Sequence, residues 1–223
     1  MSLPPPSFSS DLPADLPSPR VFVVDDDTSF RQSLLRLLES HGLEGHGYDS
    51  ATAFLAQAVT YPAGCIVLDV HMPGNSGLDL QAELEKWDCA LPVVFLTGRG
   101  DIPMSVRAMK AGATDFLTKP VDEEILLTAV HKALERNRGI VAERHRREAV
   151  RLRVRLLTER EHEVMCHVIT GALNKQIAAK LGIAEKTVKI HRGRVMEKMG
   201  VVSVAELVQA CAVAGIVSTP VGG

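Results

Sequence analysis

The sequence predicts an α/β domain with a five-stranded, doubly wound parallel sheet, followed by a helical linker and an all-α domain of four helices. Short apolar runs alternate with helical periods from Arg20 to about Lys119, which is typical of βα units with short connections. One run, at residues 65–68, is continuously apolar up to Asp69 and indicates a strand buried on both faces. After Thr158 the pattern is helical throughout.

Five strands and five helices account for the first domain. We expect strands at residues 21–24, 46–48, 65–70, 93–96 and 115–118, of which the second is the weakest because glycines interrupt it. Helices are expected at residues 29–40, 51–58, 78–87 and 103–110, and a fifth begins after Pro120. Phe30, Leu34 and Leu38 give the first helix an apolar face, and Ser50 is expected to cap the second.

The remaining residues complete the domain organisation. Residues 1–19 hold six of the twelve prolines, so we expect a disordered, Pro-rich tail. The α/β domain then covers residues 20–137, a helical linker 138–155, the all-α domain 156–217 and a flexible tail 218–223. The linker is dense in Arg, Glu and His, as a solvated helix is. A two-helix coiled coil is the alternative, although the apolar residues hold no long heptad.

The second domain contains a helix-turn-helix. Thr158 and Glu161 have the spacing of a capping box, before a helix that runs to Ile169. Asn174 is expected to cap a short helix at 175–181, which Gly182 ends. A third helix follows at about 185–199 and a fourth at 203–213. Residues 186–194 then lie in the second, recognition helix of the motif.

Charge is divided unequally along the chain. Residues 1–145 carry 12 Lys/Arg against 20 Asp/Glu, a net charge of −8, and residues 146–223 carry 13 against 7, a net charge of +6. The acidic part fits a metal or phosphate site, and the basic part fits a polyanion.

The four cysteines lack CxxC or disulfide-like spacing, and neither a membrane span nor a signal peptide is evident. We therefore expect a soluble cytoplasmic protein.

Polar residues follow four of the predicted strands. These residues are Asp25 and Asp26, Asp69, Thr97 and Lys119. Parallel strands bring them to one edge of the sheet, where crowded carboxylates favour a bound divalent metal. Asp69 alone is as easily a turn or capping residue, but the complete set favours phosphoryl transfer to Asp69. Asp27 is expected to be a capping or solvated acid.

This set resembles the receiver domain of two-component response regulators, which has a flavodoxin-like fold. The matching motifs are Val-Asp-Asp-Asp at 24–27, Leu-Asp-Val-His-Met-Pro-Gly at 68–74, Leu-Thr-Gly at 96–98 and Lys-Pro at 119–120. The resemblance covers about 120 residues and implies that Asp69 accepts a phosphoryl group. It also implies Mg²⁺ ligands at Asp25, Asp26, Asp69 and the backbone carbonyl of His71, phosphate contacts from Lys119 and Thr97, and an aromatic switch at Phe116. The side chain of His71 is expected at the surface without a role.

The second domain resembles the LuxR-type helix-turn-helix through residues 157–161, 171–178 and 187–191. Both domains together resemble the NarL/FixJ class over about 190 residues, most closely its FixJ-like branch, through residues 100–104 and 108–113. The resemblance implies base contacts from Lys189, Ile190 and Gly193, and phosphate contacts from Lys175, Thr187 and His191. Further donors for the major groove are the basic side chains of Lys186, Arg192 and Arg194.

The resemblance implies a DNA-binding transcription regulator, not an enzyme. A sensor histidine kinase would phosphorylate Asp69, and phosphorylation would promote a homodimer that binds double-stranded promoter DNA; RNA polymerase is a further candidate partner, and a membrane is not. Constitutive DNA binding with a docking receiver is one alternative. A Mg²⁺-dependent phosphatase of the haloacid-dehalogenase type, with Asp25 as nucleophile, is another.

A zinc site is also conceivable from three residues at helical spacing, His162, Cys166 and His167. They lack a fourth zinc ligand, so we expect ordinary exposed side chains there.

Overall fold

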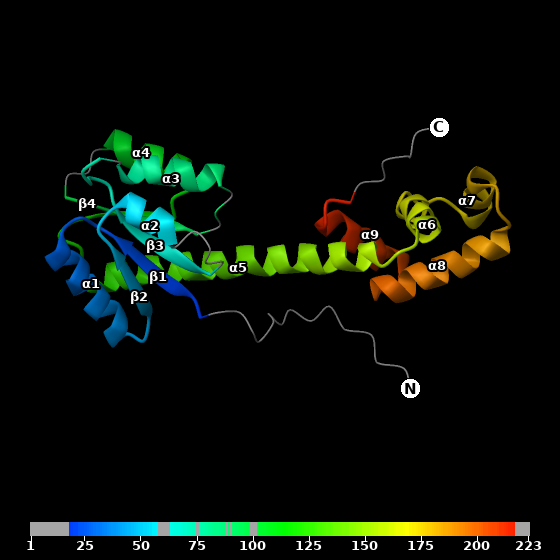
Figure 1. The fold of residues 1–223 in the computed structure, drawn as a ribbon, viewed down its shortest axis with the longest axis horizontal. Helices are drawn as coiled ribbons and strands as arrows, with labels where there is room; N and C mark the ends of the chain where they lie inside the picture. Colours follow the sequence, from blue (N-terminus) through cyan, green and yellow to red (C-terminus); the bar gives the residue numbers. More distant parts are fainter. Residues whose placement is uncertain are drawn as a thin grey trace. The chain divides into compact units, whose positions relative to one another are not determined.

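The computed structural model describes residues 18–57, 63–74, 76–87, 89, 91–98 and 102–216. The chain divides between Ala142 and Glu143 into an α/β unit and a helical unit, which are described separately (Figure 1). The expected N-terminal tail, apart from residues 18 and 19, and the expected C-terminal tail lie outside the described residues.

The α/β unit is built on a five-stranded sheet in the order β2-β1-β3-β4-β5, and all four neighbouring pairs are parallel. The strands are β1 (Arg20–Val24), β2 (Glu44–Tyr48), β3 (Gly64–Asp69), β4 (Val93–Thr97) and β5 (Asp115–Thr118). The helices are α1 (Thr28–Ser40), α2 (Ala51–Gln57), α3 (Gly77–Lys86), α4 (Ile102–Lys110) and α5 (Glu123–Arg155). The predicted doubly wound sheet is confirmed, and its strand order reverses between β1 and β3, where such sheets bind ligands.

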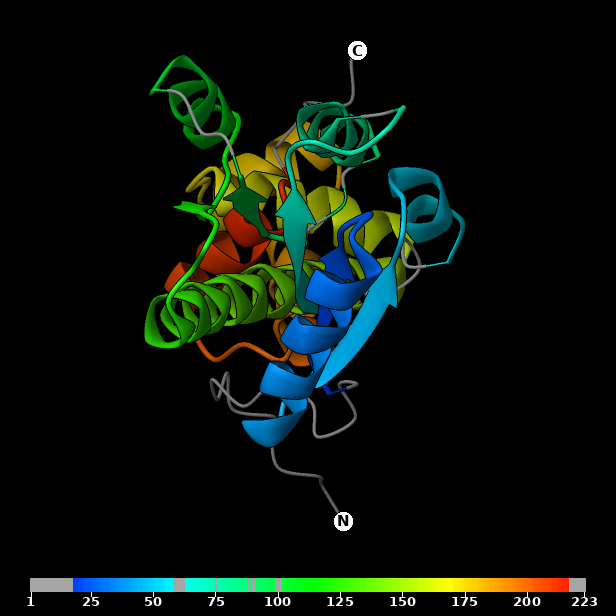
Figure 2. The same ribbon diagram turned by 90° about the vertical axis from the view of Figure 1, so that its left-hand side faces the viewer.

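Helices cover both faces of this sheet (Figure 2). Successive strand residues point to opposite faces, so β1 contributes to two separate cores. Val21 and Val23 pack with residues of α1 and α5, whereas Phe22 and Val24 pack with residues of α2, α3 and α4. Both faces of the strand are therefore buried, which accounts for its uninterrupted apolar sequence.

Two short polar side chains start helices as the sequence predicts. Asp27 caps α1, since its Oδ1 accepts hydrogen bonds from the backbone N–H of Ser29 at 2.8 Å and of Phe30 at 3.1 Å. The hydroxyl oxygen of Ser50 accepts from the backbone N–H of Ala53 at 3.3 Å at the start of α2. Asp27 thus has the capping role expected of it.

The helical unit contains α6 (Glu159–Ile169), α7 (Asn174–Leu181), α8 (Glu185–Met199) and α9 (Val204–Val213). Gly182 ends α7 and Gly200 ends α8, both in the left-handed conformation that favours glycine. The expectation that Asn174 caps α7 is wrong: Asn174 is the first helical residue. The backbone N–H of Leu173 is satisfied instead by Gln176 Oε1 at 2.9 Å, and the Asn174 side chain binds Arg192.

The last turns of α5 belong to the helical unit. Val150 is buried in the core of that unit. The Arg153 side chain donates a hydrogen bond to the carbonyl oxygen of Met199 at 3.0 Å, and Arg151 donates to that of Ala214 at 3.4 Å. These carbonyls lie at the ends of α8 and α9, where helices leave acceptors unpaired. The expected linker therefore runs as continuous helix into the helical unit. Among the described helices, none is both long and apolar enough to cross a membrane.

A buried ion pair ties α6 to α8. Glu161, only 2% exposed, accepts from Lys198 Nζ at 2.6 Å and from the backbone N–H of Thr158 at 2.9 Å. The Thr158 hydroxyl accepts from the Glu161 backbone in return, so the predicted capping box is confirmed. The Lys198 hydrogen bond, followed by the Thr158 backbone, lowers the pKa of Glu161 to about 2.

Replacing Glu161 with glutamine is expected to lower the free energy of unfolding at pH 7 by about 1.5–3 kcal/mol, because a buried charge-assisted hydrogen bond is lost. Since the folded pKa lies below the ordinary value of 4.5, the stabilisation is complete above about pH 4.5 and is lost as the pH falls towards about 2. Urea denaturation across pH 2.5–7 checks both effects. Glu163→Gln, which breaks the surface pair with Arg160, is the control and should cost under about 1 kcal/mol. Parallel pH profiles for the parent and Glu161→Gln would contradict the assignment.

Candidate functional site

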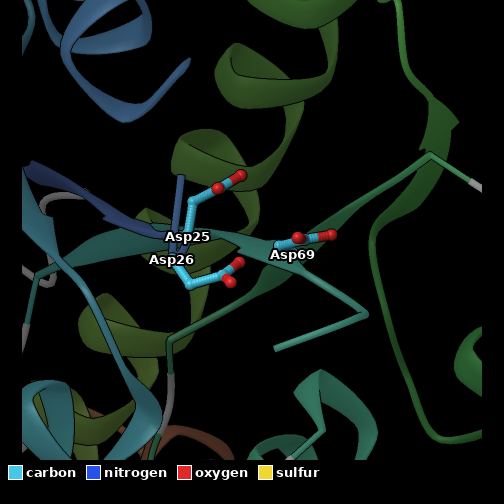
Figure 3. Close-up of side chains that lie close together, drawn as sticks. All are labelled: Asp25, Asp26 and Asp69. Atoms are coloured by element: carbon cyan, nitrogen blue, oxygen red, sulfur yellow. The ribbon is translucent and has the colours of Figure 1, made fainter. Parts of the chain in front are cut away.

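Three carboxylates meet where β1 and β3 end. Val24 pairs with Leu68 in the sheet, so the residues that follow them, Asp25, Asp26 and Asp69, leave the same edge. Figure 3 shows the three side chains projecting to one side of the strand ends. One carboxylate oxygen from each lies within 4.8 Å of the others, and among the described residues this is the group of three or more acids, histidines or cysteines close enough to hold a metal.

Lys119 follows β5 directly, and its ammonium group lies beside these acids. Its Nζ lies 2.6 Å from Asp25 Oδ2 and 3.4 Å from Asp69 Oδ2. The same ammonium lies 4.2 Å from the centre of the Phe30 ring, a cation–π distance. The backbone of Lys119 donates to the Thr97 carbonyl at 2.7 Å, which fixes it beside the end of β4. Lys119 therefore bridges two of the three acids and neutralises part of their charge.

Burial has the largest effect on the protonation of Asp25. Burial raises the pKa of Asp25, against the lowering effect of the Lys119 hydrogen bond and charge, and the charge of Asp69 raises it further. Asp25 is 1% exposed. Arg31, which the sequence analysis did not single out, donates from its guanidinium to the Asp25 carbonyl and to the Thr28 hydroxyl. Because burial disfavours the charged form of Asp25, a further cation beside its carboxylate would stabilise that form.

The Thr97 side chain is fully buried at the end of β4 and lies within reach of His71. Its hydroxyl oxygen is 3.2 Å from His71 Nδ1, a hydrogen-bonding distance. His71 lies at the surface as expected, and its side chain also contacts Thr97. This contact could not be predicted from local sequence patterns, because His71 and Thr97 are 26 residues apart.

Phe116 lies on β5, half-buried, with its ring centre 6.0 Å from that of Phe95 at a tilt of 45°. Phe95 belongs to the core beneath α2, α3 and α4. The aromatic side chain is thus in contact with the interior while part of it still faces outward.

Helix α8, the expected recognition helix, presents a mixed surface. Of the residues expected to bind DNA, the exposed ones are Lys175, Lys186, Lys189, Ile190, Gly193 and Arg194, and the half-buried ones are Thr187, His191 and Arg192. Arg192 Nη1 donates to Asn174 Oδ1 at 2.7 Å. This bond joins α8 to the first residue of α7, so Arg192 orients the two helices of the motif as well as carrying charge.

The three residues considered as zinc ligands are half-buried, not exposed as expected. Cys166 Sγ lies 3.8 Å from His162 Nδ1. Burial raises the pKa of the Cys166 thiol, which opposes the thiolate form that zinc binds. Neither the geometry nor the protonation of the described side chains favours a metal there.

An α/β unit with acids, a hydroxyl and a lysine at its strand ends, joined to a basic helix-turn-helix, defines the class of DNA-binding response regulators. Residues 21–131 match the response regulator receiver domain, and residues 155–211 match the bacterial regulatory proteins of the luxR family. The chain therefore belongs to the two-component response regulators with a LuxR-type DNA-binding domain, and it is a transcriptional regulator.

Two curated relatives show to which group of response regulators the chain belongs. Nodulation protein W of Bradyrhizobium diazoefficiens is 49% identical over 202 residues, which cover 88% of this chain and 86% of that protein. The transcriptional regulatory protein FixJ of Azorhizobium caulinodans is 43% identical over 205 residues, covering 92% and 96%. The chain is thus a member of the FixJ-like group of regulators.

Two solved structures are similar in fold as well as sequence. The response regulator StyR matches with a TM-score of 0.77 and 46% identity, covering 88% of this chain and 99% of that one. Full-length FixJ from B. japonicum matches with a TM-score of 0.54 and 36% identity, covering 89% and 98%. Both cover most of the receiver and the DNA-binding parts of this chain.

Proposed function

We propose that a sensor histidine kinase phosphorylates this regulator on Asp69, and that phosphorylation promotes dimerisation and binding to promoter DNA. The observation that carries the proposal is the meeting of Asp69 with Asp25, Asp26 and Lys119 at one edge of the sheet. Asp69 is the acceptor because it ends the central strand β3, with Lys119 at 3.4 Å. Its carboxylate oxygen would attack the phosphorus of the kinase's phosphohistidine; an acyl phosphate forms as the P–N bond breaks and the imidazole leaves.

The neighbours of Asp69 are suited to the charge that the phosphoryl group brings. Lys119 is already within ion-pair distance of Asp69 and would pair with one phosphate oxygen. The hydroxyl of Thr97 would donate to another. Both groups act where negative charge accumulates, and their positions are fixed by the carboxyl ends of β4 and β5.

We infer that the resident metal is Mg²⁺. The set of carboxylate oxygens fits a hard cation, since one oxygen from each of the three acids lies within 4.8 Å of the others. Asp25, Asp26, Asp69 and the backbone carbonyl of His71 would hold the ion. When bound, Mg²⁺ would neutralise the carboxylates and the incoming phosphoryl charge.

Dimerisation would follow from a change near β4 and β5. Thr97 would move to the phosphate, and Phe116 would fill the space that it leaves. Helix α4, beside β5, carries three exposed apolar side chains, Ile102 at 80%, Val106 at 44% and Met109 at 46%. Exposed apolar side chains of this kind fit an interface with a second copy better than contact with water. Phe116 has no hydroxyl, so the position of its ring, and not a hydrogen bond, would distinguish the phosphorylated from the unphosphorylated form.

The basic helix α8 would enter the major groove. Ile190 is 50% exposed, suited to a thymine methyl, and Lys189 offers a donor to a base edge. A Cβ added at Gly193 would meet no described atom within 4 Å. Packing within the protein therefore does not require glycine at this position, and the missing side chain would let the DNA approach α8 closely.

Replacing Lys189 with alanine is expected to weaken binding to a selected operator by about 1–3 kcal/mol, because a base-edge donor is lost. The operator is first selected from random duplexes with the phosphorylated parent, and affinities are then measured at fixed salt by fluorescence anisotropy. Lys86→Ala, which removes an exposed lysine from α3, is the control and should bind like the parent. Equal operator affinity of Lys189→Ala and the parent would refute the assignment.

The phosphatase alternative has no support in this site. Its nucleophile would be Asp25, yet Asp25 is bonded to Lys119, and the aspartate two residues later caps α1. The curated relatives described above are transcriptional regulators or a nodulation protein. The alternative of constitutive DNA binding is decided by the phosphorylation experiment that closes the Discussion.

A further inference from the structure

The contact between His71 and Thr97 joins a surface residue to a buried one. Thr97 is 0% exposed, whereas His71 is exposed, and Nδ1 of the imidazole lies 3.2 Å from the hydroxyl oxygen. The backbone on both sides holds the two residues in place. The Val70 N–H donates to the Leu96 carbonyl at 3.0 Å, and the His71 N–H donates to Asp69 Oδ1 at 3.4 Å.

A hydroxyl carries one proton, and this limits what Thr97 can do. A neutral imidazole with its proton on Nε2 has a lone pair on Nδ1 and accepts the Thr97 proton. A phosphoryl oxygen also has only lone pairs to offer. The Thr97 hydroxyl can donate to one of these acceptors at a time, so the imidazole and a phosphoryl group on Asp69 compete for it.

We propose that His71 is a positioning residue that holds the Thr97 hydroxyl in the unphosphorylated protein and competes with the phosphoryl group for its proton. This inference rests on the proposed phosphorylation of Asp69 and specifies how readily that site switches. The imidazole stabilises the unswitched arrangement, and phosphorylation must break the His71–Thr97 hydrogen bond. Removing the imidazole therefore favours the switched arrangement, and an amide that accepts from the same place preserves the balance.

Beryllofluoride, which binds an aspartate as a mimic of the acyl phosphate, tests this in the full chain with Mg²⁺. The bound fraction is read from ¹⁹F NMR signals of the protein-bound fluorides as beryllium is titrated at excess fluoride. We expect His71→Ala to bind beryllofluoride about fivefold more tightly than the parent, the equivalent of one hydrogen bond of about 1 kcal/mol. His71→Asn, which can accept from the Thr97 hydroxyl, should return close to the parent value.

A double-mutant cycle with Thr97→Ala separates positioning from a general effect of the substitution. In the Thr97→Ala background, His71→Ala should change the affinity by less than twofold, because the hydroxyl for which the imidazole competes is gone. An equal or weaker affinity of His71→Ala in the native background, or the same fivefold gain without the Thr97 hydroxyl, would overturn the proposal. If the parent binds no beryllofluoride, or Asp69→Asn binds it as well, the proposed function itself fails, and this inference with it.

Discussion

Replacing Lys119 with glutamine is expected to slow the phosphorylation of Asp69 by about 100-fold, the size of effect that follows loss of one charge-stabilising group from a preorganised site. Lys119 is the cation that the described structure places against both Asp25 and Asp69. Without it, three carboxylates within 4.8 Å of one another oppose an incoming anion. The rate is measured by intact-protein mass after addition of acetyl phosphate and Mg²⁺.

Lys110→Gln provides the matched control for that rate, since it removes the same charge from an exposed place on α4. It should phosphorylate at the parent rate. Circular dichroism at the assay temperature shows whether Lys119→Gln is folded, which separates loss of chemistry from loss of structure. A folded Lys119→Gln protein whose rate is within twofold of the parent would contradict the role of Lys119.

A DNA-binding fragment that begins at residue 156 is expected not to fold, whereas one that begins at residue 144 folds. The shorter fragment lacks Val150, which is 4% exposed, and the side chains of Arg151 and Arg153 that bond the ends of α9 and α8. Together these contacts contribute about 3–5 kcal/mol, comparable to the whole stability of a small domain. Far-ultraviolet circular dichroism with thermal denaturation compares the two fragments.

Arg153→Ala in the longer fragment isolates one of these contacts. We expect it to lower the free energy of unfolding by about 1–2 kcal/mol, because the carbonyl of Met199 loses its donor. Arg160→Ala, which removes an arginine paired with Glu163 on the surface of α6, should change it by under about 1 kcal/mol. Coincident thermal transitions of the two fragments would contradict the assignment of these turns to the helical unit.

The sheet and its acidic edge were predictable because their signals are local. The apolar run before Asp69 extends along one strand, and a strand of a parallel sheet delivers its last residue to a known edge. The caps by Asp27 and Ser50 and the capping box of Thr158 involve residues two or three apart, which sequence spacing reports directly.

The contacts that sequence patterns do not predict join residues far apart in the chain. Arg192 bonds Asn174 across 18 positions, His71 lies against Thr97 across 26, and Arg153 reaches Met199 across 46. No periodicity of 2 or 3.6 residues reports such pairs, because they depend on how finished elements pack. Asn174 shows the consequence: a good capping residue by type, it is used instead to hold the recognition helix.

The most direct test of the account is the phosphorylation of Asp69. The parent and Asp69→Asn are incubated with acetyl phosphate and Mg²⁺, separated on a phosphate-affinity gel, and tested for operator binding. We expect a retarded band in the parent alone, lost with EDTA, together with dimerisation and tighter operator binding. Operator binding of equal strength before and after phosphorylation, or a retarded band in Asp69→Asn, would contradict it.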